Sequence, residues 1–256
     1  MLVYNEDAME IKWVITADDI AMVKKVLVEN ENAFLKKRRE RNIEKKGLQI
    51  DRGMVIRTML ICLLTSQQRS GPDTVIGKFF RKHDFAATYI EISTAADIEL
   101  FIKKLLLDNN LKRYINRISE FFAHNIRIMQ KSNWDIIKEL EEVLSIDSKE
   151  MERATADRIS DKFKGLGPKQ SRNFLQSLGV TRYEIPIDSR ITKWLNNFGF
   201  PVSLNSSSLG DKGYYHFVND GFIQLCDQAG TYPCLLDAAI FSSYDGGRWN
   251  DDNVIY

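Results

Sequence analysis

Residues 161–195 read DKFKGLGPKQSRNFLQSLGVTRYEIPIDSRITKWL, and no other part of the sequence is as specific. They predict the end of one helix, a tight glycine-rich hairpin over 164–168, and a second helix that opens at Lys169 or Gln170. A short extended connector follows, and Asp188 stands where a helix N-cap belongs. The stretch therefore predicts two helices joined by a hairpin, with a capped third helix behind them.

The hairpin has the composition of a phosphate-binding turn. Gly165 and Gly167 permit positive φ and the close approach of another backbone, and Pro168 suits the first turn of a helix. Free amides of such a turn, together with the positive end of the following helix, form a seat for a phosphate group. No G-x-x-x-x-G-K-[ST] run and no G-x-G-x-x-G motif accompanies it, so this phosphate need not belong to a nucleotide cofactor.

Two ionisable residues flank the second predicted helix. Lys169 lies at its N-terminus, where the helix dipole disfavours a cation and makes a neutral, nucleophilic amine easier to form. Asp188 follows nineteen residues later, a spacing that can bring its carboxylate near the amine. Each residue alone is more simply interpreted as structural, because lysines at helix starts are common surface residues and Asp188 is a good N-cap. Together they favour a catalytic interpretation.

The motif Gly165-Leu166-Gly167-Pro168-Lys169, followed by Ile185-Pro186-Ile187-Asp188, resembles the helix-hairpin-helix DNA glycosylase superfamily. It is most similar to the 8-oxoguanine DNA glycosylase/AP lyases, which carry both the lysine and the aspartate. The resemblance is strong over 151–200, extends more weakly over 50–130 and 200–245, and is absent from the first 50 residues. It implies an all-α fold of two helical lobes with a cleft between them.

The resemblance also implies the catalytic and DNA-binding residues. Lys169 would be the Schiff-base nucleophile, and Asp188 would stabilise the positive charge that develops on the sugar. Backbone amides at Gly165 and Gly167 would hold DNA phosphates, with Arg190 as a further phosphate contact.

A loop after the apolar helix predicted over 54–64 reads Thr-Ser-Gln-Gln-Arg-Ser-Gly-Pro. In the family that the motif resembles, the corresponding loop enters the minor groove and fills the gap left by the extruded nucleotide. Gln67 matches that position best, and Gln68 is next.

The segment 236–245 reads LDAAIFSSYD and, taken alone, predicts a helix in which Phe241 is a core residue. By the resemblance, Phe241 would stack on the flipped base, and Asp237 stands where the 8-oxoguanine glycosylases carry glutamine. A carboxylate can accept from both N1–H and the 2-amino group of a guanine-type base. The two residues are four apart and therefore share one helix face.

The three cysteines are scattered (Cys62, Cys226 and Cys234), which argues against a disulfide framework. They do not supply the four grouped thiolates of the iron–sulfur glycosylases, so we expect no such cluster. A lysine without a cluster points, within the resemblance, to oxidised guanine. No cofactor is expected to be required, although the hairpin of this family often holds a structural monovalent cation. The three histidines lack partners at metal-ligand spacing and are interpreted as non-catalytic.

Composition indicates an ordinary soluble globular protein. The 256 residues are 44% hydrophobic and 28% charged, with a net charge of +1. No run of 18 apolar residues predicts a membrane span, and no basic segment before an apolar run predicts a secretory signal. We expect a monomer, cytoplasmic and associated with the nucleoid if prokaryotic, or nuclear if eukaryotic.

Four segments follow along the chain: an N-terminal extension (1–50), a helical lobe with the DNA-inserting loop (51–150), the helix-hairpin-helix with the catalytic pair (151–200), and a C-terminal helical segment that contributes to the base pocket (201–256). Residues 16–46 are predicted to be one long helix that opens with a capping box at Thr16 and Asp19. Seven basic residues between Lys36 and Lys46 are interpreted as a solvated helix face.

The predicted function is a bifunctional DNA glycosylase/AP lyase that acts on damaged double-stranded DNA. Three alternatives remain: a monofunctional glycosylase for alkylated bases, which would not need Lys169; a non-catalytic helix-hairpin-helix DNA-binding module; and a helical interaction protein with a chance match to the motif.

Overall fold

The computed structural model describes residues 13–66, 68, 71–244 and 249–254, and in this part of the chain the protein is all helical, without a strand. The predicted all-α class is confirmed. No helix within the described residues is long and apolar enough to cross a membrane.

The helices follow one another along the chain with short connections. They are α1 (Ala17–Glu29), α2 (Ala33–Arg38), the π-helical turn η1 (Arg39–Ile43), α3 (Arg52–Leu64), α4 (Val75–Lys82), α5 (Phe85–Thr94), α6 (Ile98–Asp108), α7 (Ile115–Lys131), α8 (Asp135–Ser145), α9 (Lys149–Lys162), α10 (Pro168–Ser177), α11 (Ser189–Phe198), the 3-10 turn η2 (Ser206–Gly210), α12 (Lys212–Ala229) and α13 (Pro233–Tyr244).

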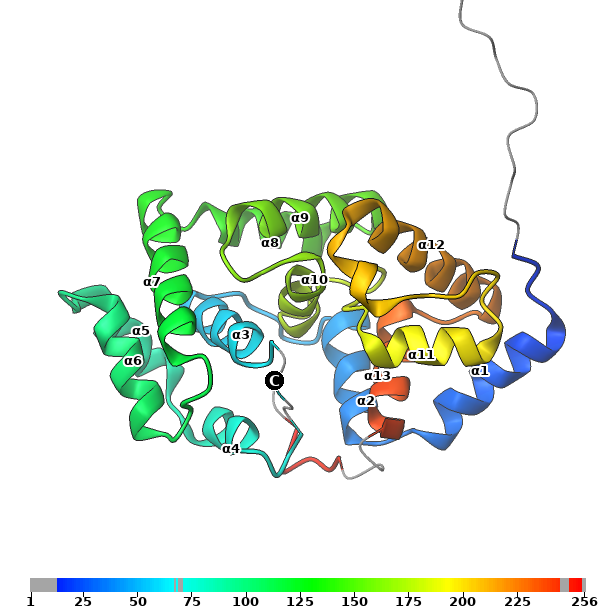
Figure 1. Cartoon of the computed structure of the whole chain (residues 1–256), viewed down its shortest axis with the longest axis horizontal. Coiled ribbons are helices and arrows are strands. Elements are labelled where there is room, and N and C mark those ends of the chain that lie inside the picture. The colour runs from blue at the N-terminus through cyan, green and yellow to red at the C-terminus, as the bar shows by residue number, and fades with distance from the viewer. Residues whose placement is uncertain (1–12, 67, 69–70, 245–248, 255–256) are drawn as a thin grey trace, which may run out of the picture.

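Hydrophobic side chains gather in three clusters that divide the helices into two groups. The largest cluster draws on α3 to α10 and has the apolar face of α3 at its centre, including Met59 and Leu60, which are fully buried. The other two join α1 and α2 to α11, α12 and α13. Figure 1 shows α4 to α7 on one side of the molecule and α1, α2 and α11 to α13 on the other, with α3 and α10 between them.

The N-terminal residues form two helices, so the prediction of one long helix over 16–46 is wrong. The capping box at Thr16 and Asp19 opens α1 as expected. Asn32 then begins a new helix, because its side-chain oxygen accepts from the amides of Phe34 and Leu35 and caps α2. Asparagine favours such a cap over a helix interior, and the break lets α2 turn back against α13.

The solvated face predicted for the basic run 36–46 is wrong for its middle residues. Arg38 is 5% exposed, and its Nη1 donates to the carbonyl of Gln176 at 3.0 Å. Asn42 is fully buried and donates to the same carbonyl at 3.0 Å, while Arg41 donates to the carbonyl of Ser177 at 2.9 Å. These side chains satisfy the free carbonyls at the C-terminus of α10, where cations are favoured. The N-terminal segment thereby anchors the helix that begins with the hairpin.

The hairpin between α9 and α10 forms as predicted, with Pro168 at the first position of α10. Gly165 has φ +79°, and a Cβ there would lie 2.6 Å from the side chain of Leu63, so both conformation and space require glycine. Gly167 has φ −65° and is the N-cap of α10, with no atom within 4 Å of an added Cβ. Gly165 therefore uses the positive φ that glycine permits, whereas Gly167 does not.

Candidate active site

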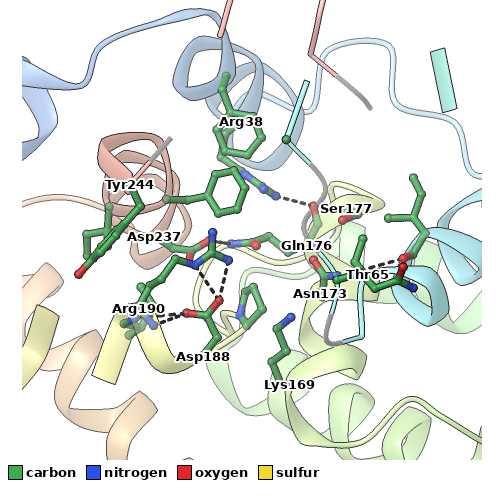
Figure 2. A pocket seen from close by; sticks show the side chains of 18 of the residues that line it. Arg38, Thr65, Lys169, Asn173, Gln176, Ser177, Asp188, Arg190, Asp237 and Tyr244 are labelled. Carbon is green, nitrogen blue, oxygen red and sulfur yellow. Dashed lines mark hydrogen bonds and ion pairs between the residues drawn. The ribbon is translucent and has the colours of Figure 1, made fainter. Parts of the chain in front are cut away.

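A cavity of about 600 Å³ opens between the two groups of helices. Side chains from α2, α3, α10, α11 and α13 line it, so segments from both ends of the chain meet there (Figure 2). Among the residues predicted from sequence, those that line this cavity are Gln68, Lys169, Asp188, Arg190, Asp237 and Phe241. Gly165 and Gly167 lie in the hairpin outside it, and Gln67 lies outside the described residues.

Lys169 enters the cavity from the first turn of α10 and is half-buried. Burial lowers the pKa of its ammonium, and the nearby negative charge of Asp188 opposes this shift. Loss of hydration, rather than the helix dipole on which the sequence prediction relied, is therefore the main cause. The lowered pKa increases the fraction of neutral amine, which is the nucleophilic form.

Asp188 caps α11, as predicted. Its Oδ1 accepts from the amides of Arg190 at 2.8 Å and Ile191 at 3.3 Å. Burial alone would raise the pKa of this carboxyl, but the bonds and charge of Arg190, with the charge of Lys169, hold the pKa below its usual value. The lowered pKa keeps the carboxylate ionised. Figure 2 shows that Asp188 and Lys169 face the same cavity.

Arg190 makes two contacts within the cavity. Its Nε and Nη2 donate to Oδ2 of Asp188 at 2.9 and 2.6 Å. Its guanidinium carbon also lies 4.3 Å from the centroid of the Phe241 ring, a distance typical of a cation–π contact. The side chain retains 34% exposure. A phosphate contact by Arg190, as predicted, would compete with these two partners.

Asp237 reaches the cavity from α13 and is 7% exposed. The side-chain amide of Gln176 donates to its Oδ2 at 3.1 Å. Burial raises the pKa of Asp237 to about 6, while the charge of Arg38 and the Gln176 bond act in the opposite direction. A second carboxyl in the cavity therefore changes charge near neutral pH, unlike Asp188.

Phe241 is partly buried in a group of three aromatic rings. Its ring stacks on Phe34 at a centroid distance of 5.2 Å, and Trp249 lies 5.9 Å away. Sequence reasoning found Phe241 and missed Phe34 and Trp249, which also line the cavity. Phe34 carries no local signal, because it meets Phe241 only after the two ends of the chain pack together.

Gln68 follows α3 and is partly exposed at the edge of the cavity. Its side-chain amide donates to the carbonyl of Leu64 at 2.8 Å, which continues the hydrogen bonding of α3 for one more residue. The side chain of Gln68, the second residue predicted to enter the DNA, is thus held against the end of α3.

Arg172 of α10 forms a buried network of ion pairs. The residue is fully buried, and its Nε donates to Glu184 at 2.8 Å and its Nη2 to Asp157 at 2.7 Å. Asp157 is also paired with His216. Because Glu184 lies in the connector before Asp188, this buried pair fastens the lysine-bearing helix to the segment that carries the aspartate.

No group of three or more histidine, cysteine or carboxylate side chains among the described residues could hold a metal ion. The three cysteines are free and buried. The cavity brings together the amine of Lys169, the ionised carboxylate of Asp188, the buried carboxyl of Asp237 and the ring of Phe241. Such a set suits covalent attack on a planar, hydrogen-bonding substrate.

No family model matches the chain, and no curated protein is similar to it. The function must therefore be inferred from the residues of the cavity and the hairpin.

Proposed function

We propose that the protein is a bifunctional DNA glycosylase/AP lyase with the helix-hairpin-helix glycosylase fold, and that it excises 8-oxoguanine from double-stranded DNA. The observation that carries this proposal is the meeting of Lys169 and Asp188 in one cavity, with the pKa of the lysine lowered by burial. A lysine with a lowered pKa beside an ionised carboxylate is the arrangement that Schiff-base chemistry at a sugar carbon requires.

The proposed reaction begins with attack of the neutral Lys169 amine on C1′ of the damaged nucleotide. The bond from C1′ to the base breaks, the base leaves with that electron pair and takes up a proton, and Asp188 stabilises the positive charge that builds on the sugar. Loss of the amine proton and opening of the sugar ring give the Schiff base. Removal of a C2′ proton then expels the 3′ phosphate and cleaves the strand. The chemistry needs an amine and a carboxylate and no metal cofactor.

DNA contact is assigned to the hairpin and to the loop after α3. Amides at Gly165 and Gly167 would hold phosphates of one strand, in binding that depends on salt and not on sequence. Gln67 and Gln68 would occupy the space of the extruded nucleotide. A monovalent cation on the hairpin carbonyls would be structural. The cleft between the two groups of helices would receive the DNA, with one protein molecule per lesion.

Borohydride trapping tests the proposal. We expect a covalent adduct between the wild-type protein and duplex DNA that contains one 8-oxoguanine, and no adduct with Lys169→Gln. Asn173→Gln, on the same face of α10, serves as the matched control and should still be trapped. An adduct with abasic DNA but not with 8-oxoguanine DNA would support the lyase activity and indicate that the excised base is a different one. Base release without trapping would favour the monofunctional alternative, and DNA binding without either reaction would favour a non-catalytic module.

A further inference from the structure

Helix α10 presents polar residues to the cavity at helical spacing. Lys169, Asn173 and Gln176 line it, four and three residues apart, and therefore share one face of the helix. Lys169 and Gln176 are seven residues apart, which places them about 10 Å apart along the helix axis at a rise of about 1.5 Å per residue.

Gln176 is nearly fully buried, with 1% exposure, and its amide bonds Oδ2 of Asp237. Among the residues that the structure describes, it is the one hydrogen-bond donor to this carboxylate. A carboxylate offers about four acceptor positions on its two oxygens. Asp237 is 93% buried and lines the cavity. Most of its acceptor positions therefore meet neither bulk water nor a donor from the described part of the protein. A ligand with N–H donors would satisfy these acceptor positions and favour the ionised form.

We propose that Gln176 is the positioning residue for base recognition: it holds Asp237 so that the carboxylate accepts from two adjacent N–H donors of a guanine-type base, while Lys169 on the same helix face reaches the sugar. This inference rests on the proposed function. Guanine and 8-oxoguanine offer N1–H beside a 2-amino group. Hypoxanthine has only the first, adenine offers one donor beside an acceptor, and thymine offers one donor between two acceptors. Hypoxanthine would leave one oxygen of the buried carboxylate without a donor. Adenine and thymine would place an acceptor atom of the base opposite a carboxylate oxygen. Both arrangements are unfavourable, so the carboxylate should reject these bases.

Recognition of two N–H donors requires the ionised form of Asp237. The charged and titratable groups around it come from several helices: Arg38 of α2, Lys169 of α10, Arg190 of α11 and its N-cap Asp188, Tyr215 and Cys226 of α12, and Cys234 of α13. Arg38, Arg190 and the Gln176 bond favour the ionised carboxylate, whereas Asp188 disfavours it. Removal of the Gln176 bond should therefore raise the pKa of Asp237 and move recognition to higher pH.

The experiment compares single-turnover release of 8-oxoguanine and of 8-oxohypoxanthine from duplex DNA between pH 5 and 8, with trapping on abasic DNA in parallel. In Gln176→Leu we expect release of 8-oxoguanine to fall roughly 10- to 100-fold, the loss of one hydrogen bond to a charged group. The preference over 8-oxohypoxanthine should fall as well, and the acidic midpoint should move up in pH. Trapping on abasic DNA, which carries no base, should persist. Gln176→Glu, which adds a second carboxylate, should move the midpoint further.

Gln170→Leu is the matched control, because Gln170 is buried on the same helix but does not line the cavity; its base preference and pH midpoint should equal those of the wild type. Equal losses on abasic and 8-oxoguanine DNA in Gln176→Leu, or an unchanged base preference, would overturn the inference. Failure of the wild type on both DNAs would instead reject the proposed function. Recognition is then tested directly by NMR titration with 9-ethylguanine and 9-ethylhypoxanthine: tighter guanine binding that Gln176→Leu abolishes supports the inference, and equal binding overturns it.

Discussion

Arg190 holds the carboxylate of Asp188 through Nε at 2.9 Å and Nη2 at 2.6 Å, and the same guanidinium lies over the ring of Phe241. One side chain thus joins the residue assigned to charge stabilisation and the ring assigned to base stacking. The ion pair keeps the pKa of Asp188 low in spite of burial. A base that stacked on this face of Phe241 would displace the guanidinium, and the charge around Asp188 would then change as the substrate entered.

Replacement of Arg190 should therefore change the pH dependence of the lyase step. Arg190→Met removes the bonds and the charge that lower the pKa of Asp188, so that burial raises this pKa. In the proposed mechanism the ionised carboxylate is the active form. Activity should therefore be lost as pH falls through this pKa, and the loss should begin at higher pH in the variant. Trapping on abasic DNA from pH 4 to 8 measures it. Lys193→Met, an exposed change on the same helix, should leave the profile in place; an unshifted profile in Arg190→Met would contradict the prediction.

Two substitutions of Asp188 separate its cap from its charge. Asparagine keeps an oxygen for the amides of Arg190 and Ile191, because it is as good an N-cap as aspartate. Asp188→Asn should therefore stay within about 1 kcal/mol of the wild type, since a partly exposed ion pair contributes little. Asp188→Ala should lose about a further 1 kcal/mol with the cap. Both should lose trapping by on the order of 100-fold. Urea denaturation and trapping rates measure the two effects; full activity in Asp188→Asn would remove the carboxylate from the mechanism.

The two hairpin glycines should respond differently to alanine. Gly165→Ala places a Cβ 2.6 Å from Leu63 and 2.7 Å from Phe121 at φ +79°, so the free energy of unfolding should fall by about 1–3 kcal/mol or more. Gly167→Ala meets no atom within 4 Å at φ −65° and should change stability by about 0.5 kcal/mol or less. A methyl group there would nevertheless crowd a phosphate on the hairpin amides, so DNA affinity in fluorescence anisotropy should decrease. Unchanged DNA affinity in Gly167→Ala would show that the hairpin amides at this position do not bind a DNA phosphate.

The buried ion pair between Arg172 and Glu184 should contribute far more to stability than a surface pair. Arg172→Met leaves Glu184 buried with only Arg153 and Asn219 as side-chain donors, and removal of one partner of a buried pair costs about 3–5 kcal/mol. Arg158→Met breaks a pair whose arginine is 56% exposed and should cost about 1 kcal/mol or less. Equal midpoints in urea for the two variants would show that the buried pair does not fasten α10 to the connector.

Local features of the fold could be predicted because their physical causes lie within a few residues. The hairpin, the proline at the start of α10 and the cap at Asp188 all formed where the sequence indicated. Cap and turn preferences depend on φ, on missing amides and on short side-chain bonds. The same reasoning missed the end of α1 and the start of α2 at Ala33. The apolar residues of 16–46 follow helical spacing throughout, and the prediction gave this spacing more weight than the capping preference of Asn32.

The neighbours of Lys169 and Asp188 could not be predicted in this way. Arg38 reaches the carbonyl of Gln176 across 138 positions in sequence, and Gln176 meets Asp237 across 61. Such contacts exist because apolar faces of α1 and α2 pack with those of α11 to α13. The sequence alone therefore determined which residues begin the helices and carry the amine and the carboxylate. Tertiary packing decided which of them are desolvated, since burial depends on segments distant in the chain, and desolvation sets the charge of Lys169 and Asp237.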